Sequence, residues 1–169
     1  IPNNFDKSNT PPGEQMLFKI FSSDTESKSS SFVRGVDAIT SIAFNGNVNT
    51  VVGVNGYNEI GNIDWILSID KQTLTGSAPD GSGLIVLTLT NVDFGTGGYT
   101  VNVELSEEFK HTAPPAESSV ANSFTITGIE VLATDTSGDT AKGLVTVEVV
   151  DDVPSVSQPN VELLGEDSE

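Results

Sequence analysis

Short apolar runs with a period of two residues constrain this sequence more than any other feature. Ile85, Leu87 and Leu89 alternate with residues that point the opposite way, and after a turn at 93–98 the same alternation resumes over 99–105 and again over 145–149. Turn-forming residues separate such runs roughly every ten positions, and no stretch has a convincing helical period. The pattern predicts an all-β fold, an antiparallel β-sandwich of the Ig-like or Greek-key type with long loops.

The first half of the chain carries the same signal less regularly. Residues 16–21, 39–44, 48–54 and 65–69 are predicted strands. A Ser-rich loop is expected over 22–31, and an Asn/Gly-rich stretch covers 55–62. Trp65 belongs to an apolar alternation with Ile63 and Leu67, which favours a place in the core over a ligand platform.

One strand breaks its own phase. Phe124 and Ile126 share one parity, whereas Ile129 and Val131 share the other. A slip of one residue would turn half of the strand inside out, so we predict a β-bulge near Thr127-Gly128.

Composition narrows the class of partners. The chain has 169 residues, 7 Lys and Arg against 24 Asp and Glu, a formal net charge of −17 and no cysteine. A surface this acidic repels phosphate backbones and anionic lipids, so nucleic acid and membrane insertion are excluded as expected partners. The excess charge is either solvated or partly neutralised by a hard cation such as calcium.

Catalytic motifs are missing from the sequence. The chain has no cysteine nucleophile, no G-x-S-x-G elbow, no H-E-x-x-H and no phosphate-cradling glycine loop. His111, the single histidine, is better explained by a structural hydrogen bond than by catalysis or metal ligation. We therefore predict a protein that is not an enzyme and has no catalytic residues.

Two acidic segments are candidate calcium sites. In the first, Asp135, Ser137 and Asp139 offer oxygens on a tight turn, and alternating strand directions bring Asp93 to the same end of the sandwich. The alternative is an Asp-rich hairpin turn in which Asp135 caps its own backbone.

The second site is the adjacent pair Asp151 and Asp152, which leaves a strand just before Pro154. Its alternatives are a charged strand end or an ion shared with a following module. The intervening strand spans about 30 Å at about 3.3 Å per residue, so Asp139 and Asp151 cannot bind one ion.

These two segments together carry a family resemblance. The run 133–143, ATDTSGDTAKG, continued by VTVEVVDDVP at 145–154, closely resembles the C-terminal half of a repeat in giant RTX adhesins exported by type I secretion from Gram-negative bacteria. Earlier segments of the chain also resemble parts of the same repeat. They are Leu74-Thr75-Gly76, Asp80-Gly81, Gly97-Gly98-Tyr99-Thr100-Val101, Phe109-Lys110-His111 and, more loosely, Gly35-Val36-Asp37. Lys110 stands where the repeat usually has Asp.

The resemblance implies a calcium-binding β-sandwich displayed outside the bacterial cell, on its surface or secreted, in a fibrous protein that mediates adhesion or biofilm formation. The resemblance covers roughly 13–154, and we expect the module at 16–154. The polar, Pro-rich residues 1–15 are expected to be a lead-in, and 155–169 an acidic linker or the start of the next module. The chain opens without an export signal, and we expect a piece of a longer protein with neighbouring modules, monomeric when isolated.

The role of such a module has three alternatives. A target-binding module would use irregular loops, and Asn55, Tyr57 and Asn58 in the Asn/Gly-rich stretch are the predicted contacts for a protein or peptide on a host or neighbouring cell. The second alternative is a spacer repeat with no ligand of its own. The third is a carbohydrate-binding module, although such modules usually present several exposed aromatic residues and this chain has a single Trp.

Overall fold

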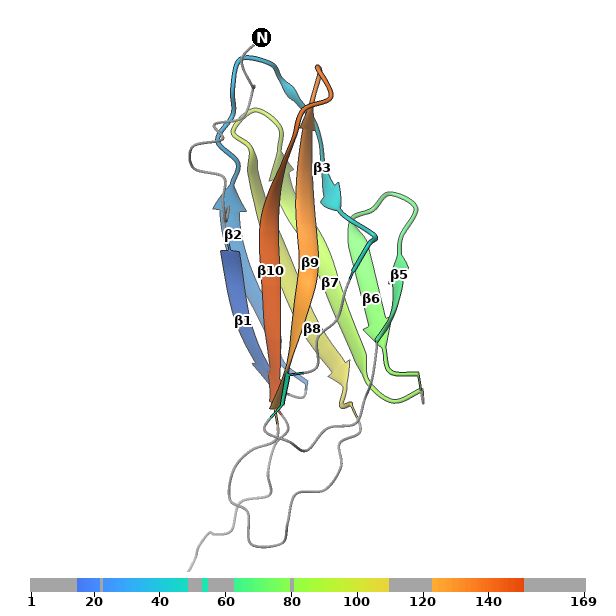
Figure 1. The fold of residues 1–169 in the computed structure, drawn as a ribbon. Helices are drawn as coiled ribbons and strands as arrows, with labels where there is room; N and C mark the ends of the chain where they lie inside the picture. The colour runs from blue at the N-terminus through green and yellow to red at the C-terminus, as the bar shows by residue number, and fades with distance from the viewer. Residues whose placement is uncertain are drawn as a thin grey trace, which may run out of the picture.

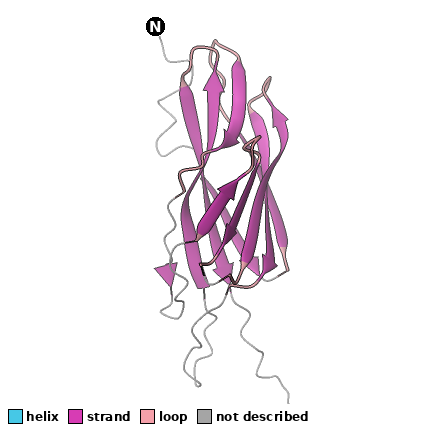
Figure 2. Cartoon of the chain, turned by 90° about the vertical axis from the view of Figure 1, so that its right-hand side faces the viewer, coloured by secondary structure: helices cyan, strands magenta, loops and turns pink. Residues whose placement is uncertain are grey.

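The fold consists of strands and the loops that connect them (Figure 2). A computed structural model of the chain describes residues 15–21, 23–48, 53–54, 63–79, 81–109 and 123–150. Its strands are β1 (Gln15–Phe21), β2 (Thr25–Ser31), β3 (Ile39–Phe44), β4 (Gly53–Val54), β5 (Asp64–Leu67), β6 (Thr73–Ser77), β7 (Leu84–Asp93), β8 (Gly98–Glu107), β9 (Ser123–Asp135) and β10 (Thr140–Val150). The described residues include no helix that is long and apolar enough to cross a membrane.

The strands form two five-stranded sheets packed face to face, which confirms the predicted β-sandwich (Figure 1). Sheet A has the order β1-β10-β9-β3, with β4 also paired to β9, and sheet B has the order β2-β8-β7-β6-β5. Neighbouring strands are antiparallel except for β1, which pairs in parallel with β10. The chain crosses from sheet A to sheet B directly after β1, so β1 and β2 each border one sheet on the same side of the sandwich.

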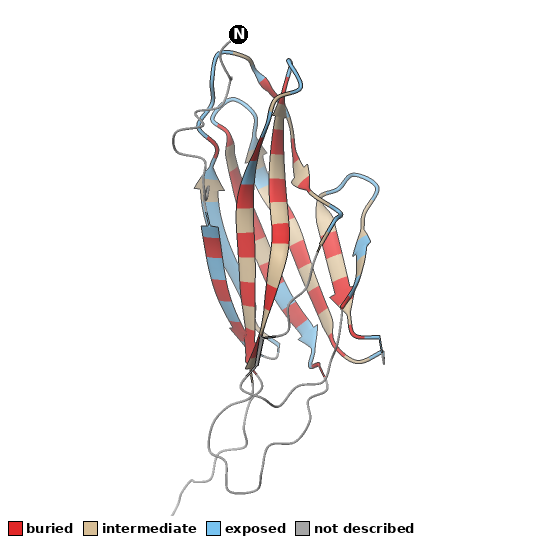
Figure 3. Cartoon of the chain, in the orientation of Figure 1, coloured by how far each residue is buried: buried red, intermediate tan, exposed pale blue. Residues whose placement is uncertain are grey.

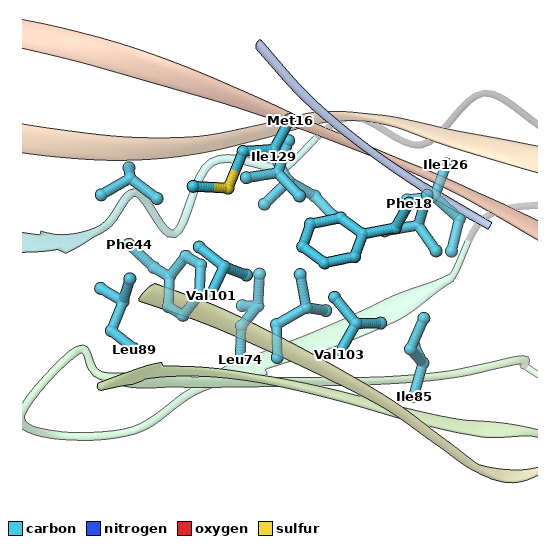
Figure 4. Close-up of a cluster of buried hydrophobic side chains, with 14 of the residues drawn as sticks. Met16, Phe18, Phe44, Leu74, Ile85, Leu89, Val101, Val103, Ile126 and Ile129 are labelled. Carbon is cyan, nitrogen blue, oxygen red and sulfur yellow. The ribbon is translucent and has the colours of Figure 1, made fainter. Parts of the chain in front are cut away.

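The alternation of the sequence decides which side chains fill the space between the sheets. Buried and less buried residues follow one another along β7, β9 and β10 (Figure 3). Side chains from the two sheets face each other across the core (Figure 4); they include Met16, Phe18, Ile126 and Ile129 from sheet A, and Leu74, Ile85, Leu89, Val101 and Val103 from sheet B. Burying one such side chain contributes roughly 1.5–3 kcal/mol, so this core supplies the rigid frame on which the loops are held.

The predicted bulge is confirmed. On β9, Thr127 and Gly128 lie opposite the single residue Thr146 of β10, because the register moves from Ile129↔Val145 to Ile126↔Val147. Gly128 has a φ of 91°, which a glycine adopts without strain. The extra residue lets Phe124, Ile126, Ile129 and Val131 all face the core, and all four are buried.

Three predictions for the first half need correction. The expected Ser-rich loop contains β2, which pairs with β8 along its whole length. Both faces of β2 are exposed (Figure 3), so an apolar alternation is not required of it. The strand predicted at 65–69 is β5 and stops at Leu67, leaving Ile69 fully exposed in the following turn. Of the strand predicted at 48–54, Gly53–Val54 pairs with β9, Val48 lies outside any strand, and 49–52 lie outside the described residues.

Candidate functional site

Three loops meet at one end of the sandwich, the end where β9 turns into β10 (Figure 1). They are the β2–β3 connection (32–38), the β7–β8 turn (94–97) and the β9–β10 turn (136–139). Two backbone hydrogen bonds tie them together: Phe32 N donates to Gly97 O at 2.9 Å, and Thr136 N donates to Ala38 O at 3.1 Å. Asp93 and Asp135 therefore share one end, as the strand directions predict.

Asp135 organises the β9–β10 turn. Its Oδ1 accepts the backbone N–H groups of Ser137 at 2.9 Å and Asp139 at 3.0 Å. The backbone closes the same turn, because Asp135 N donates to Asp139 O and Gly138 N donates to Asp135 O, both at 3.0 Å. The predicted capping interaction is thus present, and it uses one of the two carboxylate oxygens.

The other carboxylate oxygen of Asp135, Oδ2, takes no part in capping the turn. The residue is only 3% exposed, and Oδ2 is buried with no hydrogen-bond partner. Leaving a charged oxygen buried and unpaired costs several kcal/mol unless something compensates. A hard cation is a natural compensation, because carboxylate oxygen is a preferred calcium ligand.

Asp37 is a second carboxylate at this turn, and the sequence analysis did not select it. Ser137 Oγ donates a short hydrogen bond to Asp37 Oδ2, across 100 positions of sequence. The bond from Thr136 N to Ala38 O holds the two loops in this arrangement. The only signal in the sequence was the loosely matching Gly35-Val36-Asp37 motif, because spacing along the chain cannot show this contact.

Asp93 plays a different role. It is exposed, and its Oδ1 accepts the N–H groups of Gly95 at 2.8 Å and Thr96 at 3.3 Å within its own turn. Among the described residues, no group of three or more His, Cys, Asp or Glu lies close enough together to hold a metal ion. Calcium at Asp135 would therefore complete its shell with Ser137, main-chain carbonyls and water, all of which it accepts.

Several predicted site residues cannot be placed. Asp151 and Asp152, and the predicted ligand contacts Asn55, Tyr57 and Asn58, lie outside the described residues, as does His111. Trp65 can be placed: it is half-buried and packs against the core, in keeping with its alternation, with Nε1 buried and without a hydrogen-bond partner. Of the predicted calcium ligands, the structure brings together Asp135, Ser137 and Asp139 in the β9–β10 turn, and it adds Asp37 from the β2–β3 connection.

Comparison with known proteins assigns the chain to no family. No protein-family model matches the chain, and no curated protein or solved structure matches it. The likeness to adhesin repeats rests on the sequence motifs alone, and the fold supports a β-sandwich without narrowing its function.

Proposed function

We propose that this chain is a calcium-stabilised, extracellular adhesion module of a large bacterial surface protein. In this role it binds a target on a host or neighbouring cell and catalyses no reaction. The motif at 133–154 supports the proposal through its resemblance to adhesin repeats. The rigid sandwich with irregular connections is the kind of scaffold on which recognition loops are usually presented.

The observation that carries the calcium part is the unpaired, buried Oδ2 of Asp135. The same turn holds Ser137, whose Oγ donates to Asp37 of the β2–β3 connection. In a chain with a net charge of −17, a bound divalent cation lowers the self-repulsion of the folded state as well as the cost of this one carboxylate. Folding would then be favoured where calcium is abundant, as it is outside the cell.

The test is a thermal melt of the chain in millimolar calcium and again in excess EGTA. At a free calcium concentration 100-fold above Kd, the stability gain is about 2.7 kcal/mol, and the melting temperature should rise by about 5–10 °C. Magnesium is the matched control, because its smaller shell and reluctance to lose water make it a poor fit to a site built on one turn. Identical melting curves in calcium and EGTA would rule out the calcium site, and the proposal would lose its main physical support.

A further inference from the structure

A surface hollow of about 410 Å³ lies along the β3 edge of sheet A, and Thr134, at one end of its lining, directly precedes Asp135. Two neighbouring cross-strand pairs of β3 and β9 line it, Ser41↔Thr134 and Ala43↔Leu132. Asn47, from the segment after β3, and Lys71, from the turn between β5 and β6, also line it, together with Phe44, Asn45, Gly46 and Leu67. The hollow thus combines small apolar surface with hydroxyl, amide and ammonium groups, as ligand sites commonly do.

The walls of the hollow are fixed before any ligand arrives. Asn45 anchors the 45–47 segment to β9, because its Nδ2 donates to Glu130 Oε1 and its backbone N donates to Glu130 O, both at 2.9 Å. Asn47 N in turn donates to Asn45 Oδ1 at 3.1 Å. On the other side, Lys71 N donates to Ser68 O at 2.9 Å and Lys71 O accepts from Phe44 N at 3.0 Å. A preformed site loses little conformational entropy on binding.

Lys71 decides the charge of the ligand. Among the described residues that line the hollow it is the only charged one, in a chain with 7 basic and 24 acidic residues. The chain as a whole repels anions, but the ammonium group of Lys71 attracts them locally, and a carboxylate can accept a charge-assisted hydrogen bond from it.

The edge of β3 disfavours an extended peptide. A peptide that binds by strand addition needs free main-chain groups along a sheet edge. On β3 two of these groups are already used: Ile42 O accepts Gln72 Nε2 at 3.0 Å, and Phe44 N donates to Lys71 O at 3.0 Å. The side chains that line the hollow offer a ligand the hydroxyls of Ser41 and Thr134 and the amide of Asn47.

We infer that this hollow binds a carboxylate-bearing sugar unit, such as a single uronic acid residue. The carboxylate pairs with Lys71, the sugar hydroxyls pair with Ser41, Thr134 and Asn47, and the apolar face of the ring rests on Ala43 and Leu132. As an attachment site the hollow rests on the proposed adhesion role, and it assigns that role a saccharide target in place of the expected peptide.

The test is a titration of the ¹⁵N-labelled chain with D-glucuronate, followed by amide chemical shifts in calcium buffer at constant pH and ionic strength. Glucose and acetate are the probes for the hydroxyls and the carboxylate taken separately. We expect saturable shifts centred on Ala43, Asn47 and Lys71 in the millimolar range, and affinity for glucuronate roughly tenfold above either control, since it alone makes both kinds of contact.

Lys71→Gln should lower glucuronate affinity roughly tenfold through loss of a charge-assisted hydrogen bond, and Asn47→Ala, at an exposed position, should lower it less. Lys28→Gln, which removes a positive charge from β2, is the matched control and should change nothing. None of these variants should alter the calcium-dependent melting shift, so a failure here is distinct from a failure of the calcium site. Equal shifts from acetate and glucuronate, no saturable shift, or tighter binding of a Glu-rich peptide would overturn the inference.

Discussion

The β7–β8 and β9–β10 turns lie at the same end of the sandwich and are capped in the same way, but their aspartates differ in burial. In each, an aspartate at the end of a strand accepts two backbone N–H groups with Oδ1, Asp93 in the β7–β8 turn and Asp135 in the β9–β10 turn. Asp93 is exposed, so water solvates the rest of its carboxylate. Asp135 is 3% exposed, and its second oxygen has no partner.

Asp135 continues the buried face of β9 after Val131 and Ala133, and the two turns also differ in how the β2–β3 connection meets them. Residues 32–38 run beside both turns: Ala38 and Asp37 bond to the β9–β10 turn, and Phe32 bonds to the β7–β8 turn. A turn motif in the sequence therefore predicts that an aspartate caps its backbone, whereas the burial of that aspartate in the folded chain decides whether it is also a candidate cation ligand.

The largest expected effect is the loss of stability when the glycine of each turn is replaced by alanine. Gly97 and Gly138 both have positive φ, 82° and 85°. A Cβ on Gly97 would lie 2.4 Å from Phe32 O, whereas a Cβ on Gly138 would meet nothing within 4 Å. Gly97→Ala should cost about 2–5 kcal/mol, from left-handed strain plus main-chain overlap, and Gly138→Ala should cost about 1 kcal/mol from strain alone.

Urea unfolding of both variants, in EGTA to keep calcium out of the comparison, measures these costs. The pair is its own control, because the substitution and the backbone conformation are the same. Equal losses would mean that the β2–β3 connection yields to an added methyl group, and that it does not hold the two turns as firmly as the hydrogen bonds suggest.

The next largest effect is the change in stability when Asp135 is replaced by asparagine, and its sign depends on whether calcium is present. In Asp135→Asn, Oδ1 can still accept both N–H groups, but the buried charge is gone. In EGTA the variant should be more stable than the original chain by about 1 kcal/mol. In saturating calcium it should be less stable by about 2–3 kcal/mol, because the ion loses its carboxylate.

Asp93→Asn is the matched control and should stay within about 0.5 kcal/mol of the original chain in both conditions. Melting temperatures of the three proteins with calcium and with EGTA give the answer in one experiment. If Asp93→Asn loses the calcium response and Asp135→Asn keeps it, the assignment of roles to the two turns is wrong.

Much of this comparison was accessible from the sequence. The alternation of apolar residues predicted the sandwich and the buried face of β7 to β10, and the phase break predicted the bulge at Thr127-Gly128. The turn at 135–139 and its shared end with Asp93 followed from strand direction. These features are local, or follow from a simple up-and-down order of neighbouring strands.

The features that the sequence did not predict depend on contacts between segments that are distant along the chain. β2 carries no apolar alternation because it is a polar edge strand, stabilised by its backbone ladder with β8 and by side-chain bonds such as Ser29 Oγ to Thr100 Oγ1 at 2.7 Å. Asp37 reaches Ser137 through the path of a loop. The parallel place of β1 beside β10, and the hollow beside Lys71, likewise depend on which strands become neighbours in space.

The smallest expected effect uses a third aspartate turn, between β5 and β6, to show what capping does without burial. Asp70 Oδ1 accepts Ser68 Oγ at 2.6 Å and Gln72 N at 3.1 Å. These bonds, chiefly the one from Ser68, hold the pKa of the exposed Asp70 carboxyl below its usual value. A lowered pKa in the folded state contributes stability that is present above the unfolded pKa, about 3.9, and is lost as pH falls through the folded pKa.

The melting temperature of the original chain should therefore exceed that of Asp70→Asn by a small margin near neutral pH, and the margin should shrink as the pH drops below about 3.9. Carbon-detected NMR of the Asp70 carboxyl should give a titration midpoint below that same value, and Ser68→Ala should raise it. A midpoint at or above the ordinary value would mean that the hydrogen bonds of an exposed turn do not favour the charged form. The contrast between the solvated Asp93 and the buried Asp135 would then rest on burial alone.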